Sequence, residues 1–341
     1  MAPSGGMPLA ESGPVGNPER TAWVCSEGPD PARTMHQLDP DSPEFSYQEF
    51  DYLHENISEH GLDATGDVMV RRVEVESRHG RVSALSWGEE HPEVVLVHGT
   101  AQNAHTWDTV VLALGGTPAL ALDLPGHGRS AWRDDARYDP HTNADTLAEA
   151  LDGLLARPVV MLGMSLGGLT VNRLATLRPD LVARVVVVDI TPGVTEDKGR
   201  SIHDFIAGPQ TFASFEEILQ RTVEFNPTRS VPSLRRGILH NAHRNPDGTW
   251  QWNYHRAEPD RAAFATREAM WDDISSLQAP YHLVRGADSP VTDEADVAEL
   301  RRRRPDARVS VVEGAGHSIQ GDRPVELARL LEAELQARGR S

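Results

Sequence analysis

A serine stands at the centre of the segment Gly163-Met164-Ser165-Leu166-Gly167, between an apolar run and a helical pattern. The pattern Gly-x-Ser-x-Gly is typical of a sharp strand-to-helix turn, with small residues at both ends because the turn crowds the backbone. Such a turn presents the serine hydroxyl at the carboxyl edge of a sheet. A serine hydroxyl is a weak nucleophile at neutral pH, so a histidine must take its proton. The segment therefore predicts nucleophilic catalysis at Ser165.

His317 is the best placed of the 15 histidines to accept that proton. It follows the apolar run at residues 309–312, in a loop that Gly314 and Gly316 make supple. The carboxyl ends of parallel strands meet at one edge of a sheet. We therefore expect His317 to lie at the same edge as Ser165.

Four other histidines compete for a chemical role. His98 and His127 follow apolar runs and belong to loops at the same predicted edge. His240 and His243 have a spacing that suits a metal ion, but no carboxylate or thiol accompanies them in the pattern. We interpret His240 and His243 as surface residues and predict no metal site.

The elements that position these residues follow from the hydrophobic pattern after residue 70. Residues 70–76 and 81–87 predict a hairpin, and six further apolar runs are continuous rather than alternating, as in parallel strands covered by helices on both faces. We predict an α/β fold with an eight-stranded, mostly parallel sheet flanked by helices. The continuous runs are residues 94–97, 119–122, 159–162, 185–188, 281–284 and 309–312, and helical patterns cover residues 107–114, 146–155, 166–178, 292–304 and 324–337.

The alternation stops between Asp189 and Tyr281, where the chain carries helical patterns and nine aromatic residues. An insertion of this size predicts a helical cap domain over residues 192–275, between two parts of one core at residues 70–191 and 276–341. Most of its aromatic residues should form the core of the cap, and some should face a ligand. Two of them, Trp250 and Trp252, would face the same side of an extended stretch and line a substrate pocket.

The N-terminal region has a different composition. Residues 1–45 are rich in Pro, Gly, Ser and Asp, which predicts a disordered tail. In residues 46–69, Ser46 and Glu49 have the spacing of a capping box and predict a short amphipathic helix with a linker. The apolar residues of one face of that helix are Phe50, Leu53 and Ile57.

Composition excludes several classes of protein. Lys and Arg total 33 against 51 Asp and Glu, a net charge of −18 without any basic stripe, so neither nucleic acid nor anionic membrane is an expected partner. Cys25 is the single cysteine and Lys198 the single lysine, which excludes a disulfide, a cysteine zinc site and a P-loop. Without a membrane span or secretory signal, the sequence predicts a cytoplasmic protein that needs no cofactor. A homodimer is left open.

The chain resembles the α/β-hydrolase superfamily, specifically its serine-nucleophile members with a cap inserted after the sixth strand. The resemblance covers about residues 70–337 and rests on four motifs in the expected order. They are His98-Gly99, Asp123-Leu124-Pro125-Gly126-His127-Gly128-Arg129-Ser130, Gly163-Met164-Ser165-Leu166-Gly167-Gly168 and Gly314-Ala315-Gly316-His317. The resemblance implies that His317 is the general base and that His98 and His127 shape loops.

The histidine needs an acid that fixes its tautomer, and the resemblance leaves two candidates. The usual position for this acid, after the seventh strand, holds Ser289, which follows Asp288. A subset of these hydrolases has serine there and draws the acid from the end of the sixth strand, where this chain has Asp189. We favour Asp189 with Ser289 as its hydrogen-bond partner, and Asp288 is the alternative.

The resemblance also implies an oxyanion hole made by the backbone N–H groups of Thr100 and Leu166. Leu166 suits this role independently, because it begins a helix whose first N–H groups lack partners. Met164 beside the nucleophile is a candidate for substrate binding. Trp107 begins the next predicted helix and Trp132 follows the fourth strand, and each either lines the pocket or packs in the core.

These features predict a serine hydrolase that cleaves an ester or lactone of a small molecule through an acyl-enzyme at Ser165. The same triad serves thioesterases, carbon–carbon hydrolases and cofactor-free haloperoxidases, so the bond that is cleaved stays open. The competing class is a ligand-binding receptor of the same fold with vestigial turnover.

Overall fold

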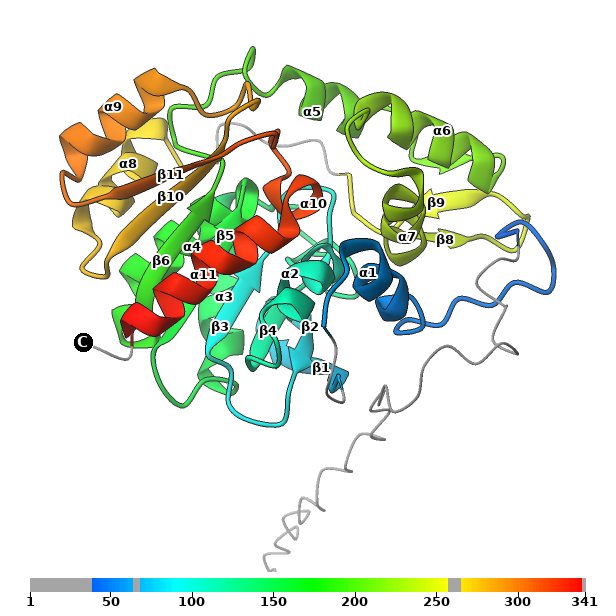
Figure 1. Cartoon of the computed structure of the whole chain (residues 1–341), viewed down its shortest axis with the longest axis horizontal. Helices are drawn as coiled ribbons and strands as arrows, with labels where there is room; N and C mark the ends of the chain where they lie inside the picture. The colour runs from blue at the N-terminus through cyan, green and yellow to red at the C-terminus, as the bar shows by residue number, and fades with distance from the viewer. Residues whose placement is uncertain (1–38, 64–67, 257–264, 339–341) are drawn as a thin grey trace, which may run out of the picture.

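The computed structural model describes residues 39–63, 68–256 and 265–338, and most of the predicted tail lies outside these ranges. Its main feature is an eight-stranded sheet in the order β1-β2-β4-β3-β5-β6-β10-β11 (Figure 1). The pairs β1·β2 and β2·β4 are antiparallel and the others are parallel, which confirms the predicted sheet. The strands are β1 Val70–Ser77, β2 Gly80–Trp87, β3 Val94–Val97, β4 Ala119–Leu122, β5 Val159–Met164, β6 Val182–Val188, β10 Tyr281–Gly286 and β11 Arg308–Val312.

Helices cover both faces of the sheet, as the continuous apolar strands predict. On one face α3, α4 and α8 pack over a core that includes Leu147, Leu174 and Ile274. On the other face α1, α2 and α11 pack over a second core that includes Leu53 and Leu327. No helix of the described residues is long and apolar enough to cross a membrane. The helices are α1 Leu53–His60, α2 Asp108–Ala113, α3 Pro140–Asp152, α4 Leu166–Leu177, α8 Arg267–Ser276, α9 Glu294–Arg303, α10 Ile319–Asp322 and α11 Pro324–Arg338, with 3-10 turns η2 Ala104–Trp107 and η3 Pro179–Leu181.

Residues 192–275 are called the insertion below, and its described residues 192–256 lie above the carboxyl edge of the sheet (Figure 1). The helical prediction was incomplete, because the insertion also contains an antiparallel sheet in the order β7-β9-β8. Its last helix, α8, packs on α4 beside the main sheet, so this helix belongs to the core rather than to a cap. The other elements of the insertion are α5 Arg200–Ile206, β7 Thr211–Phe212, α6 Phe215–Phe225, α7 Val231–Asn241, β8 Ala242–Arg244 and β9 Trp250–Trp252.

The N-terminal predictions need two corrections. The end of the predicted tail is ordered, because Asp41 accepts hydrogen bonds from Trp250 Nε1 at 2.7 Å and from the backbone N–H of Phe215 at 2.9 Å. The amphipathic helix exists but begins at Leu53, without a side-chain cap. Glu49 does not close a capping box because its carboxylate pairs with Arg72, a buried cation on β1.

Candidate active site

Ser165 occupies a strained turn between β5 and α4. Its backbone has φ 52° and ψ −121°, in a region that side-chain-bearing residues rarely adopt. The flanking glycines explain how the turn closes. A Cβ at Gly163 would lie 2.3 Å from Gly167 O, and one at Gly167 would lie 2.3 Å from Val97 O. The Gly-x-Ser-x-Gly spacing is therefore a steric requirement of this turn.

His317 and Asp189 meet at the carboxyl edge of the sheet. His317 Nδ1 lies 2.8 Å from Asp189 Oδ2, so Nδ1 carries the proton and donates to the carboxylate. Asp189 is fully buried, and its Oδ1 accepts a hydrogen bond from Gly286 N at 3.0 Å. Ser289 Oγ donates a further, short hydrogen bond to Asp189 Oδ2. This arrangement fixes the ring and leaves its Nε2 as the acceptor.

The alternative acid, Asp288, lies elsewhere. Its side chain is exposed, and its backbone N–H donates to Ala315 O at 3.0 Å. In the part of the chain that the structure describes, His317 forms its ion pair with Asp189 and none with Asp288. The geometry therefore favours the arrangement with the acid after β6.

Ser165 and His317 line one cavity of about 260 Å³, called the serine cavity below. Within the described residues, His317 Nε2 is buried and has no hydrogen-bond partner. Thr100 lines the same cavity, and a Cβ at the neighbouring Gly99 would lie 3.1 Å from Ser165 Cβ. The backbone N–H groups of Thr100 and Leu166 donate no hydrogen bond to another described residue. The site thus combines a hydroxyl, a free imidazole nitrogen and two unpaired amide donors.

The walls of the serine cavity differ from the prediction. Met164 lines it, as expected. Trp250 and Trp252 face the same side of β9, but that side is buried in the core of the insertion. Trp252 reaches a second cavity next to the serine cavity. Among the described residues of the insertion, the aromatic side chains that line the serine cavity are Phe205 and Phe225.

Two other tryptophans do not line the serine cavity. Trp107 is fully buried in the core formed by α1, α2 and α11. Trp132 is 51% exposed and stacks on His255, with ring centroids 4.4 Å apart. The prediction used only the place of each tryptophan in the sequence, and that place does not determine which way a large side chain points.

His98 and His127 stabilise loops. His98 Nδ1 donates to Gly99 O at 2.7 Å, and its Nε2 accepts from Leu124 N at 2.9 Å. His127 Nδ1 donates to Pro125 O at 3.0 Å. Burial lowers the pKa of His127 to about 3, so this ring is neutral. Both nitrogens of His98 are engaged, and neither His98 nor His127 is among the described residues that line the serine cavity.

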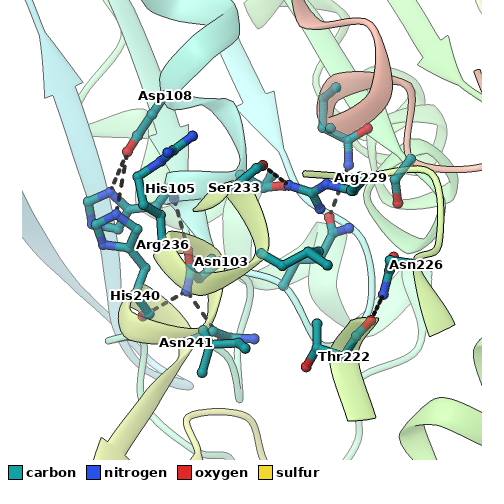
Figure 2. A pocket seen from close by; sticks show the side chains of 18 of the residues that line it. Asn103, His105, Asp108, Thr222, Asn226, Arg229, Ser233, Arg236, His240 and Asn241 are labelled. Atoms are coloured by element: carbon teal, nitrogen blue, oxygen red, sulfur yellow. Dashed lines mark hydrogen bonds and ion pairs between the residues drawn. The ribbon is translucent and has the colours of Figure 1, made fainter. Parts of the chain in front are cut away.

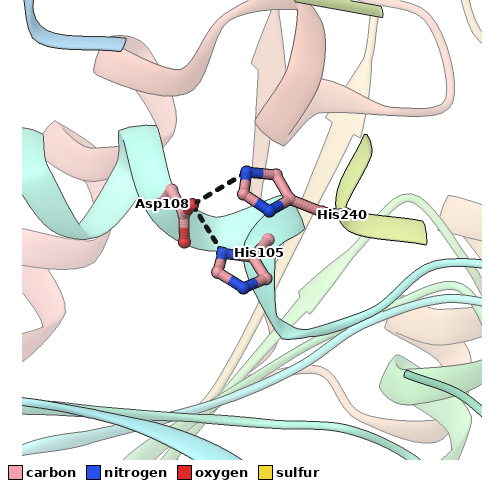
Figure 3. Close-up of side chains that lie close together, drawn as sticks. All are labelled: His105, Asp108 and His240. Atoms are coloured by element: carbon pink, nitrogen blue, oxygen red, sulfur yellow. Dashed lines mark hydrogen bonds and ion pairs between the residues drawn. The ribbon is translucent and has the colours of Figure 1, made fainter. Parts of the chain in front are cut away.

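The prediction that His240 is a surface residue was wrong, while His243 is exposed. His240 stacks on His105 with centroids 3.8 Å apart and planes at 9°, and Asp108 faces both rings (Figure 3). Asp108 Oδ2 accepts from His105 Nδ1 at 2.9 Å and lies 4.0 Å from His240 Nε2. A carboxylate therefore does accompany His240, from a helix far away in the sequence.

His105 carries a positive charge in this cluster. Burial opposes that charge. The carboxylates of Asp108 and Glu49 accept hydrogen bonds from the two ring nitrogens, and their effect outweighs burial and raises the pKa of His105 to about 9. Burial and the charge of His105 lower the pKa of His240. A single metal ion needs two converging imidazole lone pairs, whereas these rings are almost parallel. The geometry favours a charged junction that ties the insertion to the core.

The chain matches a known family. A family model for alpha/beta hydrolases matches residues 94–330, and the chain belongs to that family.

The chain is similar to a named esterase and a named lipase. The chain is 42% identical to Esterase Rv0045c of Mycobacterium tuberculosis over 297 residues, 85% of this chain and 96% of the relative. A solved structure of that esterase superposes with a TM-score of 0.76 and covers 85% of this chain and 99% of that one. The sn-1-specific diacylglycerol lipase ABHD11 of Xenopus laevis is 30% identical over 246 residues, 68% of this chain and 76% of the relative.

Proposed function

We propose that this protein is a serine esterase that forms an acyl-enzyme at Ser165. The observation that carries the proposal is the cavity shared by Ser165 and His317, whose Nδ1 donates to the buried Asp189. The similarity to Esterase Rv0045c supports an ester as the substrate. A lactone is a cyclic ester that the same groups would open, and it belongs in the substrate panel below.

In the proposed reaction, Ser165 Oγ attacks the ester carbonyl carbon while its proton moves to His317 Nε2. Asp189 accepts the hydrogen bond of Nδ1–H and stabilises the imidazolium. When the tetrahedral intermediate collapses, the alcohol leaves with the proton from Nε2. Water then gives a proton to Nε2 and attacks the acyl group, and Ser165 Oγ takes that proton as it is released.

The negative charge on the substrate oxygen would be stabilised by the N–H groups of Thr100 and Leu166. The unpaired state of both donors supports this role. A single donor of this kind contributes about 10²–10³ in kcat in other serine hydrolases.

The serine cavity suits a small ester. Its volume is about 260 Å³, and the insertion contributes apolar side chains such as Ile202, Phe205 and Phe225 to its wall. We propose that the insertion acts as a cap that selects the size of the group bound beside Ser165.

Labelling with a fluorophosphonate probe tests the nucleophile. Wild-type protein should react and also turn over short p-nitrophenyl esters, whereas Ser165→Ala should do neither while keeping its fold by circular dichroism. Ser58→Ala is the matched control because Ser58 is exposed on α1 and lines neither cavity, so both reactions should stay intact. Labelling of Ser165→Ala at the wild-type rate would refute the assignment. Wild-type protein that binds esters without turnover would instead support a receptor.

The chemical class of the substrate needs a second measurement. Esters, lactones and thioesters with matched acyl groups should be compared by kcat/KM under one condition. We expect the open-chain esters to react fastest, and a clear preference for lactones or thioesters would overturn that part of the proposal.

A further inference from the structure

A second cavity of about 170 Å³ adjoins the serine cavity. It lies between the stacked pair His105 and His240 on one side and Arg229 on the other (Figure 2). The two cavities have lining residues in common, so they are adjacent, and the proposal below places one bound molecule across both. The shared residues are Ala101, Gln102, Phe205, Asn226 and Ser318.

Arg229 brings a positive charge into this second cavity. It precedes α7, and its Nη2 donates to Ser233 Oγ at 2.8 Å. Its Nε is buried without a partner in the described part of the chain. The guanidinium also packs against α10, where a Cβ at Gly321 would lie 2.8 Å from its Cζ. The side chain is therefore held in place by a neutral hydroxyl and by packing.

The surroundings of Arg229 do not neutralise it. No carboxylate of the described residues lies within ion-pair distance of its guanidinium. The charges of Asp322 and Glu59 raise its pKa from farther away, but burial and the charge of Arg236 outweigh them and the pKa is lowered. Arg236, which lines the same cavity, pairs with Glu55 at 3.2 Å and also with Glu59.

Other arginines show that an unpaired Nε does not by itself imply a missing counter-charge. Arg173, Arg285 and Arg304 also have a buried Nε without a partner. Each of these three nevertheless has a carboxylate within ion-pair distance, namely Asp273, Glu294 and Asp306. Arg229 differs from them in lacking one.

Arg229 is half-buried and its Nε is shielded from water, so its charge is incompletely solvated, and a bound anion would offset that cost. We infer that Arg229 binds a carboxylate on the substrate, in the second cavity, while the ester bond lies beside Ser165. The planar guanidinium presents paired N–H donors that fit a carboxylate. One unpaired cation matches one negative charge, because Arg236 is already neutralised. The inference rests on the proposed esterase function and names its substrate class as half-esters of dicarboxylic acids.

The experiment compares charged and neutral esters of equal acyl length. Monomethyl adipate is matched with methyl hexanoate, and monomethyl glutarate with methyl valerate, with acid release followed in a pH-stat. The wild type should prefer the half-ester, and Arg229→Met should lower the ratio of the two kcat/KM values by about tenfold or more, as expected for a charged hydrogen bond. Arg229→Lys keeps the positive charge but loses the paired N–H donors of the guanidinium. Its kcat/KM ratio should fall between those of the wild type and Arg229→Met.

Arg200→Met is the matched control, because Arg200 is an exposed arginine of the insertion that pairs with Asp197 and lines neither cavity. It should leave the ratio unchanged. Equal losses on charged and neutral esters in Arg229→Met, with Arg229→Lys unchanged in its ratio, would overturn the inference. In that case turnover of the neutral esters by the wild type would still support the esterase.

A binding measurement separates the two proposals further. In the Ser165→Ala background, calorimetry measures the affinity for monomethyl adipate without turnover. We expect the added Arg229→Met change to weaken binding about tenfold, and equal affinity with and without it would also overturn the inference. Absence of turnover of every ester by the wild type would instead refute the esterase.

Discussion

Replacing Asp189 by Asn tests the acid of the proposed triad, and the structure shows how the change acts. Asp189 Oδ1 faces a donor, the backbone N–H of Gly286, at 3.0 Å. The oxygen of an Asn side chain would stay on that donor, so its NH₂ group would face His317 Nδ1. That nitrogen would have to present a lone pair, and the ring proton would move to Nε2. His317 would then have no acceptor for the proton of Ser165.

A wrong tautomer of this kind lowers kcat by about 10⁴ in a serine protease, which corresponds to about 5.4 kcal/mol. We expect a loss of that size for Asp189→Asn with a short p-nitrophenyl ester, measured in steady state. Ser289→Ala removes one hydrogen bond to the carboxylate and should cost about tenfold. Asp288→Asn is the matched control, since Asp288 is exposed, and should change kcat less than about threefold.

The result that would refute this reasoning is the opposite ranking, with Asp288→Asn inactive and Asp189→Asn active. Thermal melting of each variant separates a catalytic loss from unfolding. An Asp189→Asn protein that melts like the wild type and retains more than about a tenth of kcat would also contradict the assignment.

Three further predictions concern packing and charge. His105 has its pKa raised to about 9, so its stabilising charge is fully present below about pH 6.5 and is lost as pH rises through about 9. From about pH 7 to about pH 10, urea denaturation should show the free energy of unfolding fall by about 2.5 kcal/mol more in the wild type than in His105→Gln, and equal losses in the two proteins would contradict this. Phe225→Ala should enlarge the serine cavity and raise the kcat/KM ratio of hexanoate over acetate esters several-fold, while an unchanged ratio would place Phe225 outside the substrate path. Asp41→Ala should cost about 2 kcal/mol of unfolding free energy and change Trp250 fluorescence, because it removes the acceptor of Trp250 Nε1, and unchanged melting would contradict this.

The sheet and the turn at Ser165 could be predicted because their determinants are local. Continuous apolar runs define strands buried on both faces, and all four residues of β3 are buried. The two glycines around Ser165 are required because the backbone is crowded within this one turn, so the short sequence pattern predicts the turn. The position of Asp189 at the end of β6 follows from the same strand pattern.

The walls of the cavity could not be predicted, because they depend on how distant segments pack. Trp250 and Trp252 share one side of an extended strand as predicted, but nothing in their spacing shows that this side faces the insertion's own core. The charged junction joins His105 to His240, which lie far apart in the sequence. The spacing of His240 and His243 gives no indication of a carboxylate on a distant helix.

The insertion is tied to the loop that carries one proposed oxyanion donor. Asn241, at the end of α7, donates from Nδ2 to Ala101 O at 2.7 Å, and Asn103 Nδ2 donates to His240 O at 2.9 Å. Ala101, next to Thr100, has φ 60°, so the loop needs such external contacts to hold a strained conformation. The insertion, which we propose selects the substrate, therefore also holds the loop of a proposed oxyanion donor, and movement of α7 would change binding and transition-state stabilisation together.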